Sequence, residues 1–436
     1  MHQLFRPCHV LIQAVAVALI SSLGVSGAAD ATTDDRLLSP TVKQVGTFAG
    51  VPYVQYDGIF EGDTSTGAFR VPYRITAPTD PSLGNATVLV EPSHFVIGLG
   101  ALNIYLRPDL LFTRGFAHAG VGWSTTSFGP GADQRILDPS APGVFIEGGV
   151  EDSGGRTDHE IITEFAKALA TDPEAGSMLG RVSRRYATGF SDSSFAIMDL
   201  VTSGRAANVF DLALPFTTEG ADPQLAIAAR RYSGKLVIVN SEAEVSDNLV
   251  DRGVAPNHYR FYAVAGTPHI PDFLDVPFFS SGSTPASWVP ALRAHFLQGH
   301  RWVVTGAPPP SSYHLKTAAD REVARDANGN AIAVNASGQP VPRLPFLELG
   351  EARFVTGFTG SYADVRTIAQ LGFGAHAAYA KAFRDRLAAY LKAGYILSDD
   401  AASMRARSGL CVPLTYTETY RDHYEQFVAI ASCTTA

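Results

Sequence analysis

Short apolar runs bounded by turn residues recur along the middle of this chain, and amphipathic stretches lie between them. The runs have the length of strands buried on both faces, and they occupy residues 86–92, 116–123, 209–215, 235–240 and 259–264. From Thr157 the spacing changes to helical intervals, with apolar positions at Ile161, Ile162, Phe165, Ala166 and Leu169. Strands that alternate with helices predict an α/β fold, with a mostly parallel sheet and helices on both faces.

Other patterns flank this alternating part. Residues 30–72 contain alternating stretches, as at 51–56, and predict an N-terminal antiparallel region. Residues 124–156 are rich in Gly, Pro and Ser without periodicity, which is typical of a long loop over a site. After residue 270, amphipathic helices are predicted at 288–304 and 379–397 around a turn-rich stretch. We expect a single domain over residues 30–436, in which residues 271–436 form a lid or helical elaboration on the same core.

The stretch 182–201 carries the strongest candidate for chemistry. A strand-like run leads into Gly189-Phe190-Ser191-Asp192-Ser193, and a helix-like run follows at once. A strand, a tight turn with a serine at its apex and a helix form a nucleophile elbow, whose helix N-terminus faces charge developing near the serine. The usual pattern ends in Gly where this chain has Ser193, and short matches of this kind also arise by chance. Ser191 is the predicted nucleophile.

A serine hydroxyl needs a base to take its proton and a carboxylate to orient that base. The strand at 236–240 is followed by three acidic residues, of which Glu244 is the predicted acid; the spacing leaves Glu242 and Asp247 as alternatives. His269 follows the strand at 259–264 and a Gly, and we predict it as the base rather than a surface or core histidine. The residues then follow one another along the chain as nucleophile, acid and histidine, which is the order typical of enzymes with a nucleophile elbow.

Two backbone amides are expected to face the oxygen of a tetrahedral intermediate. One is the amide of Asp192, after the nucleophile. The other is expected from the backbone of Ser93 or His94, after the strand at 88–90. His94 is equally a candidate for a side-chain contact with substrate or for an ordinary loop residue. The carboxylate of Asp192 disfavours a nearby oxyanion unless it points outward or is paired.

The N-terminus has the pattern of a secretory signal peptide, with Arg6 before an apolar stretch that ends in small residues. We expect residues 1–29 to be removed and the mature protein to be secreted or periplasmic, without a stable membrane span. An uncleaved anchor is the alternative. Cys8 leaves with the signal, and Cys411 and Cys433 are then predicted to form a disulfide, with two buried free thiols as the alternative.

Composition limits the other classes of function. The chain is 46% hydrophobic and 17% charged, which is typical of a globular protein. A net charge of −8 without a Lys/Arg cluster argues against a nucleic-acid partner. The sequence has no H-E-x-x-H motif, paired C-x-x-C motif or carboxylate cluster at ligand spacing, and no G-x-x-x-x-G-K-[ST] loop. We therefore predict no metal and no cofactor.

Four stretches together resemble the "alpha/beta hydrolase domain" family of bacterial and fungal secreted or periplasmic proteins. They are the elbow at 189–194, the strand end at 239–244, the run at 260–269 that ends in His269, and a helix with its R-W-V and P-P residues at 291–309. The resemblance runs from about Tyr73 to the C-terminal helices. It implies the α/β-hydrolase fold and serine-hydrolase chemistry on esters by a Ser191–Glu244–His269 triad. Its departures, Asp192 and Ser193, concern the oxyanion hole more than the triad.

These inferences favour a carboxylic ester hydrolase that acts on a small-molecule or polymeric ester through an acyl-enzyme. A binding protein that keeps the fold without turnover is one alternative, motivated by the irregular elbow. Acyl transfer or peptide cleavage by the same triad is another.

Overall fold

The protein is represented by a computed structural model, which describes most of the chain. The described residues are 35–65, 67–94, 98–100, 105–123, 135–137, 145–147, 158–244, 247–270, 284, 286–319 and 322–408. They belong to one compact unit. The predicted signal peptide at 1–29 and the predicted pair Cys411–Cys433 lie outside the described residues, so both stay predictions. Within the predicted loop at 124–156, only the short antiparallel strands β6 (Arg135–Leu137) and β7 (Phe145–Glu147) are described.

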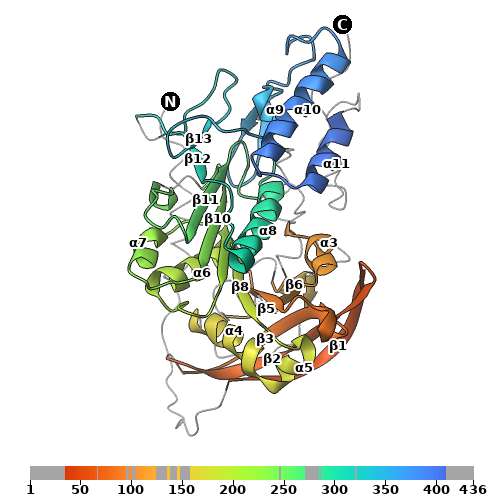
Figure 1. Ribbon diagram of the computed structural model, residues 1–436, viewed down its shortest axis with the longest axis vertical. Helices are drawn as coiled ribbons and strands as arrows, with labels where there is room; N and C mark the ends of the chain where they lie inside the picture. Colours follow the sequence, from red (N-terminus) through yellow and green to blue (C-terminus); the bar gives the residue numbers. More distant parts are fainter. Residues whose placement is uncertain are drawn as a thin grey trace. The chain divides into compact units, whose positions relative to one another are not determined.

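An eleven-stranded sheet forms the centre of the molecule, in the order β1-β2-β3-β5-β4-β8-β9-β10-β11-β12-β13 (Figure 1). Its parallel part consists of β5 (Ala117–Val121), β4 (Thr87–Pro92), β8 (Arg184–Phe190), β9 (Leu212–Phe216), β10 (Lys235–Ser241), β11 (Tyr259–Val264) and β12 (Tyr313–Leu315). Every residue of β4 and of β9 is buried. These strands are apolar without alternation because both of their faces are covered.

Antiparallel strands extend both ends of this sheet. The predicted N-terminal region is formed by β1 (Arg36–Phe48), β2 (Val51–Thr64) and β3 (Gly67–Pro78), and β3 joins the parallel part by pairing with β5. At the other end, β13 (Ala333–Asn335) pairs antiparallel with β12. The prediction of a mostly parallel sheet with antiparallel N-terminal strands is confirmed.

Helices cover both faces of the sheet. On one face, α4 (Glu160–Thr171) and α6 (Asp192–Ser203) pack against β4, β8 and β9, and the predicted apolar stripe of α4 is buried. On the other face, α8 (Val289–Thr305) packs against β9 and β10. The shorter helices are α3 (Pro108–Leu111), α5 (Pro173–Leu179), α7 (Pro223–Ala228) and α9 (Pro345–Glu348), with 3₁₀ turns η1 (Pro81–Leu83), η2 (Phe112–Arg114) and η4 (Asp247–Leu249).

The C-terminal part differs from the prediction in two respects. The helix predicted at 288–304 is α8, which covers the sheet itself and so belongs to the core layers as much as to a lid. The helix predicted at 379–397 corresponds to α10 (His376–Lys392), which ends five residues earlier, and a further helix that was not predicted, α11 (Ser398–Ser408), follows. The chain turns between them at Gly394, whose φ of +80° favours glycine. A small hairpin, β14 (Arg353–Val355) and β15 (Ser361–Ala363), lies between α9 and α10.

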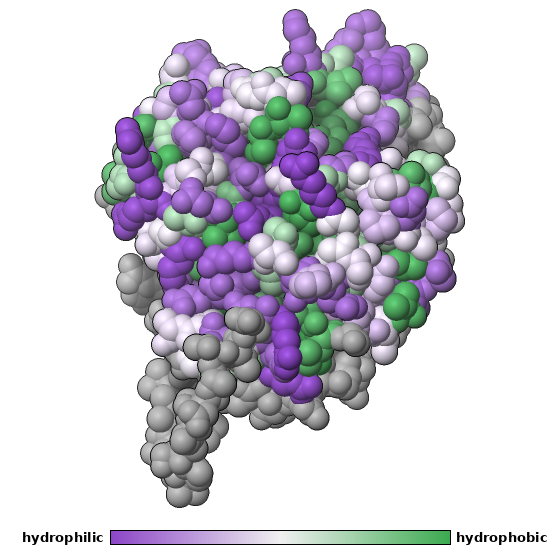
Figure 2. Space-filling model, turned by 60° about the horizontal axis from the view of Figure 1, so that its bottom comes forward, coloured by the Kyte–Doolittle hydropathy of each residue, from purple (hydrophilic) through white to green (hydrophobic). Residues whose placement is uncertain are grey.

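The surface mixes hydrophilic and hydrophobic side chains. On the face shown in Figure 2, groups of hydrophobic residues lie between hydrophilic ones across the described part of the chain. Scattered apolar residues of this kind are normal on a globular protein. Among the described helices, none is long and apolar enough to cross a lipid bilayer.

Candidate active site

The turn between β8 and α6 presents Ser191. Strand β8 ends at Phe190 and α6 begins at Asp192, so Ser191 stands at the C-terminal edge of the parallel strands. Ser191 has φ 53° and ψ −117°, which is strained for any residue with a Cβ. A Cβ on Gly189 would lie 2.7 Å from the carbonyl carbon of Ser193. Glycine is therefore required at 189 for the chain to close this turn.

Ser193, which replaces the usual glycine of the elbow, takes part in closing the turn. Its buried hydroxyl donates to the carbonyl oxygen of Phe190 at 2.8 Å and accepts from the amide of Phe190 at 3.0 Å. The hydroxyl thus satisfies both polar groups of the last strand residue. The departure from the usual pattern is compatible with a tight elbow.

Ser191, His269 and Glu244 form a continuous chain of hydrogen bonds. His269 Nε2 lies 3.0 Å from Ser191 Oγ, and His269 Nδ1 lies 2.5 Å from Glu244 Oε1. The side chains of His269 and Glu244 are 11% and 7% exposed. The second carboxylate oxygen of Glu244 accepts from the hydroxyl of Ser241 at 2.6 Å and from its amide at 3.2 Å. The carboxylate is therefore fixed from both sides.

Glu242, one of the alternative acids, has its carboxylate engaged by groups other than the imidazole of His269. Its carboxylate accepts from the amide of Gly266 at 2.7 Å, pairs with Arg325 at 2.6 Å and accepts from the hydroxyl of Thr356 at 3.1 Å. These partners belong to the turn before His269 and to the C-terminal part of the chain. Glu242 therefore ties segments together beside the site.

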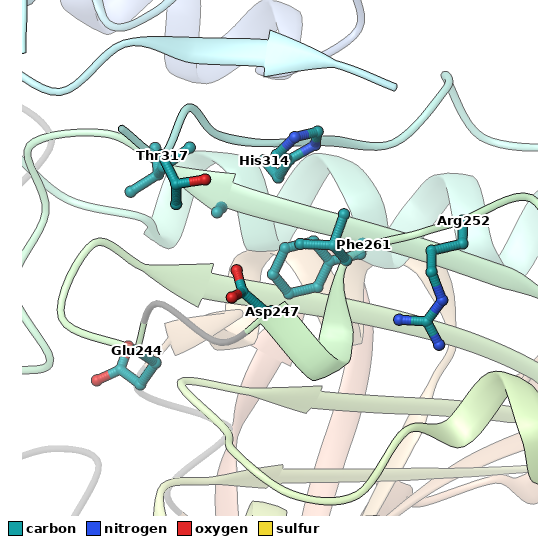
Figure 3. A pocket seen from close by; sticks show the side chains of 9 residues that line it. Glu244, Asp247, Arg252, Phe261, His314 and Thr317 are labelled. Carbon is teal, nitrogen blue, oxygen red and sulfur yellow. The ribbon is translucent and has the colours of Figure 1, made fainter. Parts of the chain in front are cut away.

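Asp247, the other alternative acid, lies in η4 and, together with Glu244, lines a cavity of about 260 Å³. In the view of Figure 3, Asp247 lies between Glu244 and the ring of Phe261. The cavity is lined by Glu244, Asp247, Val250, Arg252, Phe261, Ala263, His314, Leu315 and Thr317. Of the three carboxylates after β10, Glu244 is the one hydrogen bonded to His269.

The predicted oxyanion donors differ in whether their amides are hydrogen bonded within the protein. The amide of Ser93 donates to Val121 O at 2.8 Å, and that of His94 donates to Gly98 O at 3.1 Å. Both amides are therefore hydrogen bonded within the protein: that of Ser93 continues the pairing of β4 with β5, and that of His94 closes an isolated bridge with Gly98. A role of either amide as an oxyanion donor stays a prediction. Asp192 is the first residue of α6, where the N–H groups of a helix are left to acceptors outside it.

The side chains of Asp192 and His94 lie together beside the elbow. His94 Nε2 is 3.0 Å from Asp192 Oδ1, with side-chain exposures of 4% and 15%. The ring of His94 also stacks on that of Phe190, with centroids 5.2 Å apart. Burial, and secondarily the charge of His269, lowers the pKa of His94 to about 3, so its imidazole is neutral at neutral pH. The carboxylate of Asp192 is thus directed at a polar partner.

Sequence reasoning missed two neighbours of the triad. Ser241, whose hydroxyl donates to Glu244, lies in the stretch 239–244 that resembles the family, but its position in the sequence indicates no role. Phe358 stacks on the imidazole of His269, with ring centroids 5.0 Å apart. Phe358 comes from the distant segment between β14 and β15, and no local pattern marks it.

The site consists of side chains that can donate and accept protons. Among the described residues, no group of three or more His, Cys, Asp or Glu side chains is arranged to hold a metal ion. What the arrangement provides is a strained serine, an imidazole in contact with it and a buried carboxylate behind that imidazole. Such a set can activate a hydroxyl as a nucleophile.

Several solved structures are similar to this chain at low identity. Est1E from Butyrivibrio proteoclasticus is 10% identical with a TM-score of 0.31, and the match covers 56% of this chain and 99% of that chain. Acetyl xylan esterase 1 from Thermoanaerobacterium sp. is 12% identical with a TM-score of 0.27, covering 52% and 80%. A cold-adapted esterase from an Arctic intertidal metagenomic library is 13% identical with a TM-score of 0.27, covering 47% and 77%.

A search of curated proteins finds no match to the sequence. The sequence does match a family model, and the match spans the parallel strands, the elbow and α8. With the model for "Alpha/beta hydrolase domain" matching residues 60–406, the chain belongs to the alpha/beta hydrolase domain family.

Proposed function

We propose that the protein is a serine hydrolase that cleaves carboxylic esters, with Ser191 as nucleophile, His269 as general base and Glu244 as the orienting acid. The observation that carries this proposal is the hydrogen-bond chain from Ser191 Oγ through His269 to Glu244. Membership of the alpha/beta hydrolase domain family supports it.

The geometry suits acyl transfer to the serine. As Ser191 Oγ attacks the acyl carbon, its proton passes to His269 Nε2, and Glu244 stabilises the imidazolium through Nδ1–H. The negative charge moves to the former carbonyl oxygen, which faces the N-terminus of α6 and the amide of Asp192. When the tetrahedral intermediate collapses, the leaving alcohol takes the proton from His269. Water then attacks the acyl-enzyme while His269 takes its proton and passes it to Ser191 Oγ. This step releases the acid and free Ser191.

Burial of the triad strengthens these steps. His269 and Glu244 are nearly enclosed, and the local dielectric constant is lower than that of water. The pairing of Nδ1 with Glu244 holds the tautomer in which Nε2 accepts the proton of Ser191. The imidazole is therefore prepared for proton transfer before substrate binds.

The proposal is tested by hydrolysis of p-nitrophenyl esters of increasing acyl length, together with a polymeric ester, by wild type and Ser191→Ala. We expect wild-type turnover and a decrease of about 10³-fold or more for Ser191→Ala. Full activity in that variant would refute the role of Ser191. Product analysis with an added alcohol, and with an amide substrate, separates ester hydrolysis from acyl transfer and peptide cleavage.

Export remains part of the proposal. The basic start, apolar middle and small residues at 26–29 support cleavage near residue 29 and a secreted or periplasmic location. The test is the intact mass of the protein recovered from the medium or periplasm. A mass that includes residues 1–29 would contradict cleavage.

A further inference from the structure

A segment from the C-terminal part of the chain lies directly over the histidine of the triad. The amide of His269 donates to the carbonyl of Gly357 at 2.9 Å, and the amide of Ile270 donates to the carbonyl of Phe358 at 2.8 Å. Residues 356–360, between β14 and β15, therefore run alongside the histidine loop as a short strand would. We call residues 356–360 the cover segment.

Two aromatic rings pack on the imidazole, and one of them comes from the cover segment. Phe358 stacks on His269 with centroids 5.0 Å apart and planes at 16°, and Phe190 packs on the imidazole at 5.2 Å and 36°. Phe190 is 2% exposed, whereas Phe358 is 47% exposed. One ring is thus part of the core, and the other remains accessible beside the proton-transfer group.

Specific contacts hold the cover segment in place. Glu242, buried at the base of the histidine loop, binds Thr356 of the cover segment, the neighbouring Arg325 and the amide of Gly266. At the far end, a Cβ on Gly360 would lie 2.6 Å from the Cγ2 atom of Thr284. The segment is anchored on both sides of Phe358, so the position of the ring is defined by the fold.

The position of the ring fits a contact with the leaving group. In ester hydrolysis, the leaving oxygen takes its proton from Nε2 of His269 and must lie within hydrogen-bond reach of it. The alcohol part of the substrate then extends beside the imidazole, where Phe358 offers accessible apolar surface. Aromatic surface gains most from an apolar or aromatic partner.

Resting on the proposed function, we infer that Phe358 is a specificity-determining residue that binds the alcohol portion of the ester, and that the enzyme prefers esters of apolar or aromatic alcohols over those of short alkyl alcohols. Phe358 is not required for the proton transfers. Its role is to favour the acylation step for one class of leaving group.

The test compares benzyl acetate with ethyl acetate. The two esters share an acyl group and release primary alcohols, of which only benzyl alcohol carries an aromatic ring. Both give the same acetyl-enzyme, so a difference in kcat/KM arises in binding and acylation. We expect wild type to prefer the benzyl ester by about tenfold or more. Phe358→Ala should lose about 5- to 20-fold on benzyl acetate and no more than about twofold on ethyl acetate.

Two further variants keep this test decisive. Phe358→Leu retains apolar bulk without the flat ring, and we expect it to recover part of the benzyl preference. Val355→Ala removes another exposed apolar side chain from the adjoining hairpin and should change neither rate. Thermal unfolding of all variants confirms folding, and Phe358→Leu carries the comparison if Phe358→Ala does not fold.

Each outcome separates this inference from the proposed function. Equal losses on both esters would show that Phe358 only positions the imidazole, which overturns the inference. Wild-type hydrolysis of both esters without preference overturns it as well and leaves the serine-hydrolase proposal intact. If wild type hydrolyses neither ester and a fluorophosphonate does not label Ser191, the proposed function fails, and the inference fails with it.

Discussion

Three carboxylates follow β10 within one short loop, and each has different partners. Glu244 binds His269 and Ser241, Glu242 binds Thr356 of the cover segment, and Asp247 lines the cavity of Figure 3. A carboxylate that holds a catalytic imidazole is distinguished by contact with its Nδ1. We therefore assign different effects to the same substitution at the three positions.

We predict that Glu244→Gln lowers kcat for ester hydrolysis by about 10³- to 10⁴-fold, because the amide neither holds the correct tautomer nor stabilises the imidazolium. Asp247→Asn is the matched control and should remain within about threefold of wild type. Steady-state kinetics on a p-nitrophenyl ester makes the comparison. A large loss in Asp247→Asn with near-normal activity in Glu244→Gln would contradict the assignment.

Some residues of the candidate site could be predicted from the sequence, and others could not. The strand ends and the elbow singled out Ser191, Glu244 and His269, but spacing could not separate Glu244 from Glu242, because hydrogen bonds such as that of Ser241 decide the matter. The hydrogen bonds that the amides of Ser93 and His94 make within the protein could not be predicted, because such backbone contacts are not visible in the local sequence.

Among the elements, the elbow depends on the close approach of β8 to α6. The carbonyl group of Ser193 leaves no space for a Cβ at residue 189. The strain at Ser191 is maintained only while the strand and the helix hold their relative positions. Alanine at residue 189, which adds only a Cβ, therefore tests whether the elbow needs this close approach.

We predict that Gly189→Ala displaces Ser191 and lowers kcat/KM by about 100-fold or more, since a shift of about 1 Å is enough to misplace a nucleophile. Gly176→Ala, in α5, is the control, because a Cβ there meets nothing within 4 Å. That change should leave activity unaltered and stabilise the helix by roughly 0.5–1 kcal/mol. Kinetics and thermal unfolding of both variants provide the readout; wild-type activity of Gly189→Ala would rule out this account of the turn.

Elements were predicted best where a single physical cause fixes them. The parallel strands are buried on both faces, so their apolar runs are plain in the sequence, as in β4 and β9. The predicted helix ran past the end of α10, although Gly394 marks that end, and α11 was not predicted. The cover segment could not be predicted, because its contacts with the histidine loop join residues far apart in the chain.

Across the whole molecule, Arg293 of α8 connects helices that are distant in sequence. Its guanidinium donates to Leu106 O at 2.6 Å, to Asp400 of α11 at 3.2 Å and to Asp109 of α3 at 3.3 Å. Arg293 and Asp400 are both buried, with 5% and 6% of their side chains exposed. The pair thus attaches the C-terminal helices to the core.

We predict that Arg293→Met destabilises the protein by about 3–5 kcal/mol, because it leaves Asp400 buried without its cation. Burial already raises the pKa of Asp400, and Arg293 opposes that effect. The double variant with Asp400→Asn removes the uncompensated charge and should recover at least half of the loss. Urea denaturation measures both values; equal stabilities of the single and double variants would argue against this cause.

Two buried histidines make stability depend on pH. Burial lowers the pKa of His94 and of His295 to about 3 each, whereas an unfolded histidine titrates near 6.5. Between these values the unfolded chain binds more protons, so the free energy of unfolding rises with pH. The stability from each histidine is complete above about pH 6.5 and is lost as the pH falls toward 3.

We predict that His295→Phe reduces the pH dependence of stability by about 1 kcal/mol per pH unit between pH 4 and 6. The new ring can keep the stacking on Tyr262, where the centroids are 3.5 Å apart, although the bond to Gln298 is lost. Urea midpoints measured across this range give the slope. An unchanged slope would mean that His295 is not held neutral by burial.

The central claim is that Ser191 is an activated nucleophile, and covalent labelling tests it most directly. The intact protein is treated with a fluorophosphonate, digested, and the modified peptide is identified by mass spectrometry. We predict one adduct, on Ser191, whose rate of formation falls sharply in His269→Ala and which is absent from Ser191→Ala. Labelling of Ser191→Ala at the wild-type rate, or no adduct on the folded wild type, would contradict the account.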